Sequence, residues 1–182
     1  MVDNFRNKLA DTRLSLMFSV FSDSKATIIR HITNLKELYD EAVKDNNKQV
    51  EFNEAFADIM KKVDSRGYYL IHRLAELEEC DESYKAMEDL LTMLNNIEVK
   101  RDKKGHVNIN IQTGYLDSTN NEITIVNDKT ALHIAAEKGN TGIYALLHDK
   151  ISADNTIKNK EGKTPKELIL PDKKDSFNFF KF

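Results

Sequence analysis

The chain has 182 residues, of which 30 are acidic and 27 basic, and its formal net charge is −3. Nucleic-acid binding needs a concentrated basic surface, so this balance argues against a nucleic-acid partner. The only cysteine, Cys80, excludes an internal disulfide and a cysteine-rich zinc site, and it favours a reducing compartment. With two prolines and six glycines, the composition favours helices.

No apolar run approaches the roughly 20 residues that span a bilayer. The segment "LSLMFSVF" (14–21) is similar to the core of a signal peptide only faintly, because it is short and "SDSKA" behind it is a poor cleavage site. We therefore expect an amphipathic first helix, no signal peptide, no membrane insertion and a cytoplasmic location.

The N-terminal region, residues 1–63, is predicted to form three helices at 4–21, 24–46 and 50–63. The clearest apolar stripe lies on the second, where apolar residues recur at steps of four and three: Ile28, Ile32, Leu35, Tyr39 and Ala42. These stripes predict core packing.

A short helix is predicted at 68–77, and a longer one, over 84–94, follows a polar turn. The next region changes character, because apolar and polar residues alternate over 105–113 and again over 122–128. Alternation with a period of two is typical of strands, so we expect a β-hairpin here.

Two further stretches repeat a pattern. "TALHIAAEKGN" (130–140) resembles the ankyrin-repeat signature T-P-L-H-x-A-A-x-x-G-N, and only Ala131 departs from it, where proline is usual. The matching residues are Thr130, Leu132, His133, Ala135, Ala136, Gly139 and Asn140. "GKTPKEL" (162–168) restarts the unit 34 residues later, close to the family period of 33.

An earlier stretch, "YLIHRLAELEE" (69–79), aligns with the same signature through His72, Ala75 and Glu76 but lacks its Thr-Pro and Gly-Asn. His72 precedes His133 by 61 residues, so an insertion is required between them. The resemblance implies a mainly α fold, in which a short ankyrin solenoid of about 2.5–3 repeats follows the N-terminal helices.

In this interpretation the chain divides into three parts. Residues 1–63 form a helical region that caps the array, since an open end of a stacked array must be covered. Residues 64–171 form the repeats, with the hairpin inserted at about 98–127. Residues 172–182 form an aromatic tail.

Ankyrin arrays characteristically bind proteins through loop tips and the concave face of their inner helices, and rarely catalyse. The resemblance therefore implies a non-enzymatic protein-binding module, with the inserted hairpin adding to its surface. The residues expected to bind the partner are Asn127, Asp128, Lys129, Glu137, Lys138, Lys160, Glu161, Lys163, Phe179 and Phe180.

Two segments leave alternatives open. The tail has four phenylalanines, Phe177 among them, which either fold back onto the open end of the array or insert into a partner. The basic run "VKRDKKGH" (99–106) is either a solvated loop or a docking patch for an acidic partner.

We find no nucleophile–base arrangement, phosphate-binding loop or paired Cys/His spacing, and expect no catalytic residue, metal, cofactor or small-molecule substrate. The alternative is that residues 1–63 carry an activity, enzymatic or inhibitory, which the repeats target. Small divergent ankyrin proteins rich in Lys, Asn and Ile resemble effectors of intracellular bacteria or viruses. This implies a host protein as partner and the host cytoplasm or nucleus as the working location.

Overall fold

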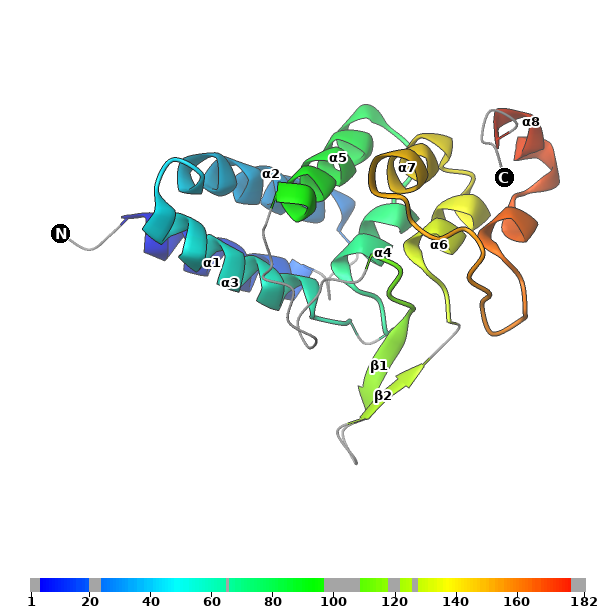
Figure 1. The fold of residues 1–182 in the computed structure, drawn as a ribbon, viewed down its shortest axis with the longest axis horizontal. Helices are drawn as coiled ribbons and strands as arrows, with labels where there is room; N and C mark the ends of the chain where they lie inside the picture. Colours follow the sequence, from blue (N-terminus) through cyan, green and yellow to red (C-terminus); the bar gives the residue numbers. More distant parts are fainter. Residues whose placement is uncertain are drawn as a thin grey trace.

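A computed structural model describes residues 4–19, 24–64, 66–96, 109–117, 122–125 and 128–177. Helices dominate this part of the chain and follow one another in a row from the N-terminal to the C-terminal end (Figure 1). The shorter helices α4 (Leu70–Glu76) and α6 (Ala131–Lys138) lie side by side, and α5 (Asp81–Asn96) and α7 (Thr141–Ala145) pack behind them. The chain is therefore mainly α.

The N-terminal region forms the three predicted helices: α1 (Asn4–Ser19), α2 (Lys25–Ala42) and α3 (Asn46–Met60). All five apolar residues predicted for the stripe of α2 are buried. The third helix begins four residues earlier than predicted, because the side chain of Asp45 accepts hydrogen bonds from the backbone N–H groups of Asn47 and Lys48. Helix α2 ends at Ala42, before residues 45–48 ("DNNK"), and these residues start the next helix.

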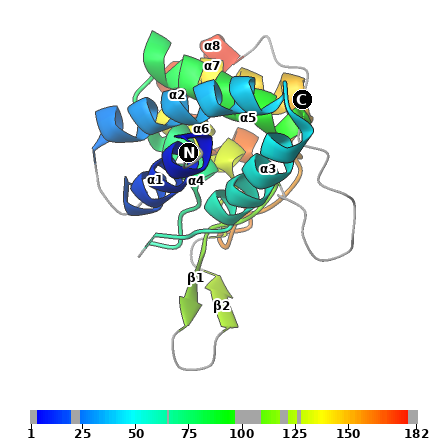
Figure 2. The ribbon, with the colours of Figure 1, turned by 90° about the vertical axis from the view of Figure 1, so that its left-hand side faces the viewer.

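Helix α2 contacts α1 and α3 on one side and α5 on the other. Figure 2 looks along this arrangement from the N-terminal end, with α2 lying across α5. Each buried Ile or Leu side chain of α2 stabilises the packing by about 1.5–3 kcal/mol. The N-terminal helices are therefore joined to the rest of the fold mainly through α5, with further contacts between α3 and α4.

A tight turn at residues 64–68 leads into α4. The backbone N–H of Asp64 donates to the carbonyl of Tyr68, and the N–H of Gly67 donates to the carbonyl of Asp64, both at 2.9 Å. The Asp64 carboxylate accepts from the backbone N–H groups of Arg66 and Tyr68, both at 2.8 Å. Gly67 has φ = +78°, a conformation that favours glycine.

Another turn with the same pattern, at residues 159–163, precedes Pro165. The N–H of Asn159 donates to the carbonyl of Lys163, and that of Gly162 donates back to Asn159, both at 2.9 Å. The Asn159 side chain accepts from the N–H groups of Glu161 and Lys163 at 3.0 Å. Gly162 has φ = +76°. We call 64–68 the first turn and 159–163 the third turn.

A turn of this kind also leads into α6, but it is interrupted by strands. The N–H of Thr113 donates to the carbonyl of Lys129 at 2.9 Å, and the Thr113 hydroxyl accepts from the N–H of Lys129 at 3.1 Å. Asp128, with φ = +55°, occupies the position of Gly67 and Gly162. Fourteen residues, 114–127, replace the two that form the tip of the other turns.

Strands β1 (Gly114–Asp117) and β2 (Glu122–Ile125) pair antiparallel within this second turn and project away from the helices (Figure 1). The strand predicted at 105–113 was wrong in its described part, since 109–113 forms no strand, and 105–108 lies outside the described residues. The alternation there has another cause: Ile109 and Ile111 pack against the core as irregular chain.

The first and second turns touch through their backbones. The N–H of Gly114 donates to the carbonyl of Gly67 at 2.8 Å. A Cβ atom on Gly67 would lie 2.5 Å from the carbonyl carbon of Gly114, well inside van der Waals contact. A Cβ atom on Gly162 would meet nothing within 4 Å. The close approach is therefore a property of the first turn.

The C-terminal part is built from short turns. Helix α7 runs into the π-helical segment η1 (Leu146–Lys150), and the short helix predicted from Thr164 is a single 3₁₀ turn, η2 (Pro165–Leu168). A further 3₁₀ turn, η3 (Pro171–Lys173), leads into α8 (Lys174–Phe177). Phe177 is buried against Tyr144 in an edge-to-face contact with ring centroids 5.2 Å apart, so the start of the tail folds back.

The two glycines predict a matched pair of substitutions. Both Gly67→Ala and Gly162→Ala should cost about 1 kcal/mol, because each residue has a left-handed conformation. Gly67→Ala should cost about 1–3 kcal/mol more, because its methyl group collides with Gly114. Urea denaturation of the two variants would measure the difference, and equal losses of stability would contradict the contact between the turns.

Candidate protein-binding surface

Helices α4 and α6 each have a histidine in the first turn of the helix that accepts a backbone hydrogen bond. In α6 the side chain of Thr130 accepts from the backbone N–H of His133, and the N–H of Thr130 donates to His133 Nδ1 at 3.1 Å. In α4 the N–H of Tyr69 donates to His72 Nδ1 at 3.2 Å. The bond to Nδ1 holds each imidazole at the start of its helix.

The other ring nitrogen of each histidine reaches a backbone carbonyl in a loop farther along the chain. His72 Nε2 lies 3.0 Å from the carbonyl oxygen of Ile111, and His133 Nε2 lies 3.0 Å from that of Lys163. Since Nδ1 accepts from a backbone N–H in both rings, Nε2 carries the proton and donates to the carbonyl. His72 and His133 therefore make the same pair of contacts, one to the start of their own helix and one to a loop farther along the chain.

Both imidazoles are buried and stay neutral at physiological pH. Burial lowers the pKa of His72 from 6.5 to about 4, partly opposed by its bond to Ile111. Burial also lowers the pKa of His133, against the bond to Lys163. With both nitrogens engaged, neither ring is positioned to act as a general base.

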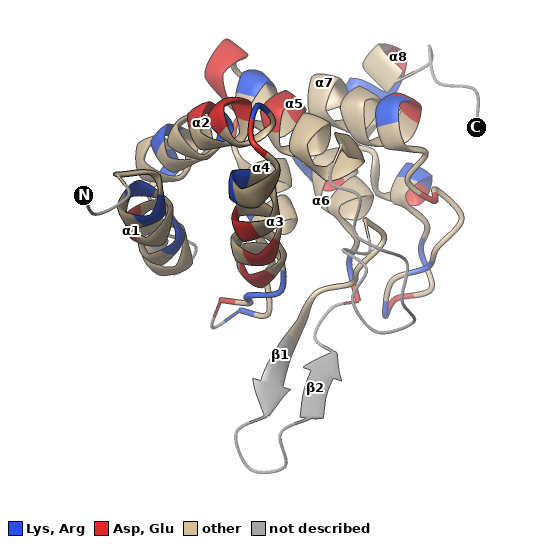
Figure 3. Ribbon diagram, turned by 60° about the vertical axis from the view of Figure 1, so that its left-hand side comes forward, with Lys and Arg blue, Asp and Glu red and all other residues tan. Residues whose placement is uncertain are grey.

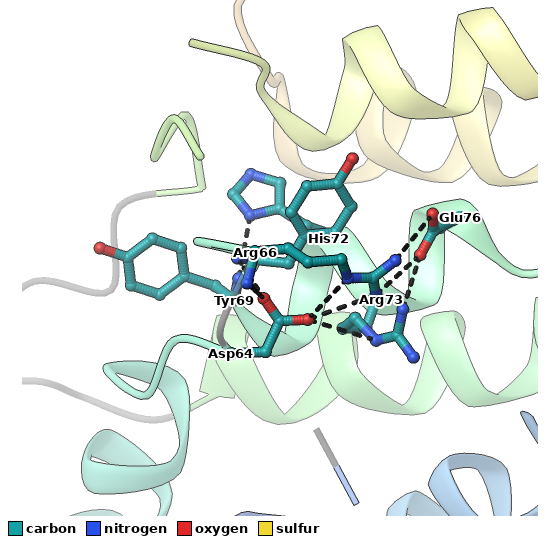
Figure 4. A network of polar contacts seen from close by, with 7 residues as sticks. Asp64, Arg66, Tyr69, His72, Arg73 and Glu76 are labelled. Carbon is teal, nitrogen blue, oxygen red and sulfur yellow. Dashed lines mark hydrogen bonds and ion pairs between the residues drawn. The ribbon is translucent and has the colours of Figure 1, made fainter. Parts of the chain in front are cut away.

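The first turn carries a closed network of charges (Figure 4). The guanidinium of Arg66 lies 3.3 Å from the carboxylates of both Asp64 and Glu76. Arg73, although buried, lies 2.7 Å from Glu76 and 3.9 Å from Asp64. Arg66 also stacks over the ring of Tyr68, 4.9 Å from its centroid. Two acids and two arginines thus balance one another beside α4.

The second turn has a simpler pair at corresponding positions. Lys129 Nζ lies 2.7 Å from the carboxylate of Glu137, which is on the exposed side of α6. The Lys129 side chain is 17 % exposed and that of Glu137 is 43 % exposed. Asp128, beside them, is half-buried. The structure therefore brings together three of the residues predicted to bind a partner.

The remaining predicted residues are distributed over other places. Lys160, Glu161 and Lys163 are exposed on the third turn, where Lys163 pairs with Glu161 at 3.2 Å. Asn127, Phe179 and Phe180 lie outside the described residues.

Lys138 lies away from the turns, at the far end of α6. It lines a hollow of about 400 Å³ together with Glu78, Glu79, Asn140 and Lys173. The side chain of Asn140 donates to the carbonyls of Ala75 and Leu77, which ties this end of α6 to α4. Lys138 therefore lies apart from Asp128, Lys129 and Glu137.

The sequence interpretation missed the charges of the first turn. Aligning His72 with His133 places Tyr68 and Glu76 at the positions of Lys129 and Glu137, so the signal for Glu76 was present. Nothing in the residue types marked Arg66 and Arg73 as partners, because their ion pairs join the turn to the helix in space.

In the described ranges, no group of three or more His, Cys, Asp or Glu side chains could hold a metal ion. No helix within those ranges is both long and apolar enough to cross a membrane. No model of a known protein family matches the chain, and no curated protein sequence was found to be similar to it. The surface must therefore be interpreted from its own geometry.

The buried histidines predict that stability falls in mild acid. A folded-state pKa near 4 for His72, against 6.5 when unfolded, means that the unfolded chain binds more protons below pH 6.5. The loss should develop as the pH falls from about 6.5 to about 4 and reach about 3 kcal/mol for this residue. Above pH 6.5 its contribution should be constant.

Urea denaturation at several pH values would measure this dependence. His72→Gln keeps a side-chain N–H for the Ile111 carbonyl but cannot titrate, so it should be less stable at neutral pH and show a shallower decline in acid. An unchanged slope in this variant would show that His72 is not the titrating group.

Proposed function

We propose that the chain is a short ankyrin-like array that binds a protein partner and does not catalyse a reaction. The observation that carries this proposal is the repeated unit of turn, short helix and buried histidine, in which each imidazole bonds to the loop of the next unit. Repeat arrays of this kind present loop tips and inner helix faces as a continuous binding surface.

The proposed surface comprises the three turns and the exposed sides of α4 and α6. Glu76 and Glu137 occupy equivalent positions on the two helices, and charged side chains of the turns lie next to each. Strands β1 and β2 extend this surface, since they replace the tip of the second turn (Figure 1). Insertions at one face of an array often mark its binding side.

For residues 1–63 we propose the role of a cap. The packing of α2 on α5 supports this role, because it covers a helix of the first unit that would otherwise be open at the end of the array. An enzyme or inhibitor in this region, targeted by the repeats, is the alternative.

We also propose that the partner belongs to a eukaryotic host cell and that the chain works in its cytoplasm or nucleus. The lone cysteine, which suits a reducing compartment, and the richness in Lys, Asn and Ile support this proposal.

Affinity purification from eukaryotic cell lysate, with the products identified by mass spectrometry, would test the binding function. The variant Lys129→Ala/Glu137→Ala removes an ion pair from the proposed surface, and Lys36→Ala/Asp40→Ala removes a matched pair from α2. Both variants should lose less than about 1 kcal/mol of stability. Affinity for the captured partner should fall about tenfold in the first variant and stay unchanged in the second.

Two further baits would locate the contact. In one, residues 114–127 are replaced by Lys-Glu, the tip of the third turn, which keeps the bonds between Thr113 and Lys129. The other ends at Phe177, which keeps the buried contact with Tyr144. Capture of no specific protein by the folded full chain would contradict the binding function, and residues 1–63 should then be assayed for an activity.

A further inference from the structure

The three turns differ in how their charges are compensated. At the first turn, Arg66 and, on α4, Arg73 are paired with Asp64 and with Glu76 of α4. In the second turn Lys129 is paired with Glu137 at 2.7 Å. The first set of charges is balanced, whereas the second turn also carries Asp128 and, on its inserted strands, Asp117 and Glu122, so it has an excess of negative charge.

The third turn has an excess of positive charge. Lys158, Lys160 and Lys163 are all exposed, and Glu161 is the acid among them (Figure 3, basic positions in blue). Lys163 pairs with Glu161 at 3.2 Å, whereas neither Lys158 nor Lys160 forms an ion pair with any described residue. Neither of these two ammonium groups is therefore held in an ion pair within the described part of the chain.

The acids that flank this turn are held by other groups. The Glu167 carboxylate accepts from the backbone N–H and the hydroxyl of Thr164 at 2.8 and 2.9 Å. The Asp154 carboxylate accepts from the backbone N–H and the hydroxyl of Thr156 at 2.8 and 2.6 Å. Both carboxylates stabilise the local backbone. The pKa of Glu167 is lowered by its bonds to Thr164 and, less strongly, by Lys158 and Lys163, so this acid offsets part of the charge of the lysines.

The side chain at the centre of the turn also lacks an acceptor. Asn159 Nδ2 is buried and has no hydrogen-bond partner among the described residues. In the first turn the corresponding atom is Asp64 Oδ2, which has Arg66 as its partner. Because this atom is buried, the feature of the third turn that an anionic partner would complement is its excess of exposed lysines.

We propose that the third turn docks an acidic segment, rich in Asp and Glu, of the protein partner. This inference rests on the proposed binding function and names the chemistry of the partner at one end of the surface. Lys158, Lys160 and Lys163 attract and orient the acidic segment, whereas the first turn is balanced and the second turn is acidic, so neither of these attracts it.

A titration of the full chain with fluorescein-labelled peptides, followed by fluorescence anisotropy, tests this assignment. The probe is a peptide of alternating Glu and Gly, and its control has Gln in place of Glu. At an ionic strength of about 20 mM the Debye length is roughly 20 Å, so charges attract over a long range. The Glu peptide should then bind and the Gln peptide should not. Added salt should weaken binding.

Two charge-matched variants locate the site. Lys158→Gln/Lys160→Gln/Lys163→Gln should bind the Glu peptide about tenfold more weakly, whereas Lys44→Gln/Lys61→Gln/Lys62→Gln, which alters exposed lysines of the N-terminal region, should bind normally. Equal losses would show a general charge effect and overturn the proposal, as would absence of binding. Equal affinity for a single-stranded RNA of the same charge would overturn the choice of a protein segment.

The two proposals fail separately. Suppose that the full chain retains a lysate partner, that Lys129→Ala/Glu137→Ala weakens this binding and that the third-turn variant leaves it unchanged. This result would overturn only the proposal that the partner docks through an acidic segment. The binding function would then stand on the second turn and α6.

Discussion

The hydrogen bond from a buried imidazole to the backbone of the next unit is the contact on which the rest of the structure depends. His72 and His133 each receive a backbone N–H at the start of their own helix and donate to a carbonyl beyond it. One side chain therefore fixes both the start of a helix and its distance from the neighbouring loop. Burial makes this bond strong and keeps the imidazole neutral, so it couples stacking to pH.

This arrangement separates the packing of α4 and α6 from the exposed surface of the turns. The bonds between Thr113 and Lys129 hold the base of the second turn in the geometry of the other two, and fourteen residues leave from that base and return to it. Because the ends of the insertion are held together, the chain between them changes the outer surface without shifting α6. The charged side chains are also separate from this packing, since they lie on the turns and on the exposed sides of the helices.

The extent to which the fold could be predicted depended on the range of the contacts. The stripe of α2 was correct because its five residues share one face at helical spacing, whatever they pack against. The strand at 105–113 was wrong because alternation records which side chains are buried and does not require a paired strand. At the candidate site, Lys129 and Glu137 came from a motif match, but the environment of Lys138 could not be inferred from its neighbours in sequence.

The sequence by itself determined the helices, the recurrence of the unit around His133 and the lack of any recognisable catalytic set, because these are properties of local spacing and residue type. Only the tertiary structure decided that Arg66 and Arg73 neutralise Asp64 and Glu76, and that Gly67 must remain small beside Gly114. It also decided that, of the three lysines of the third turn, Lys163 forms an ion pair, with Glu161. The physical reason is that ion pairing and steric exclusion depend on distances between residues far apart in the chain, which spacing along the sequence does not record.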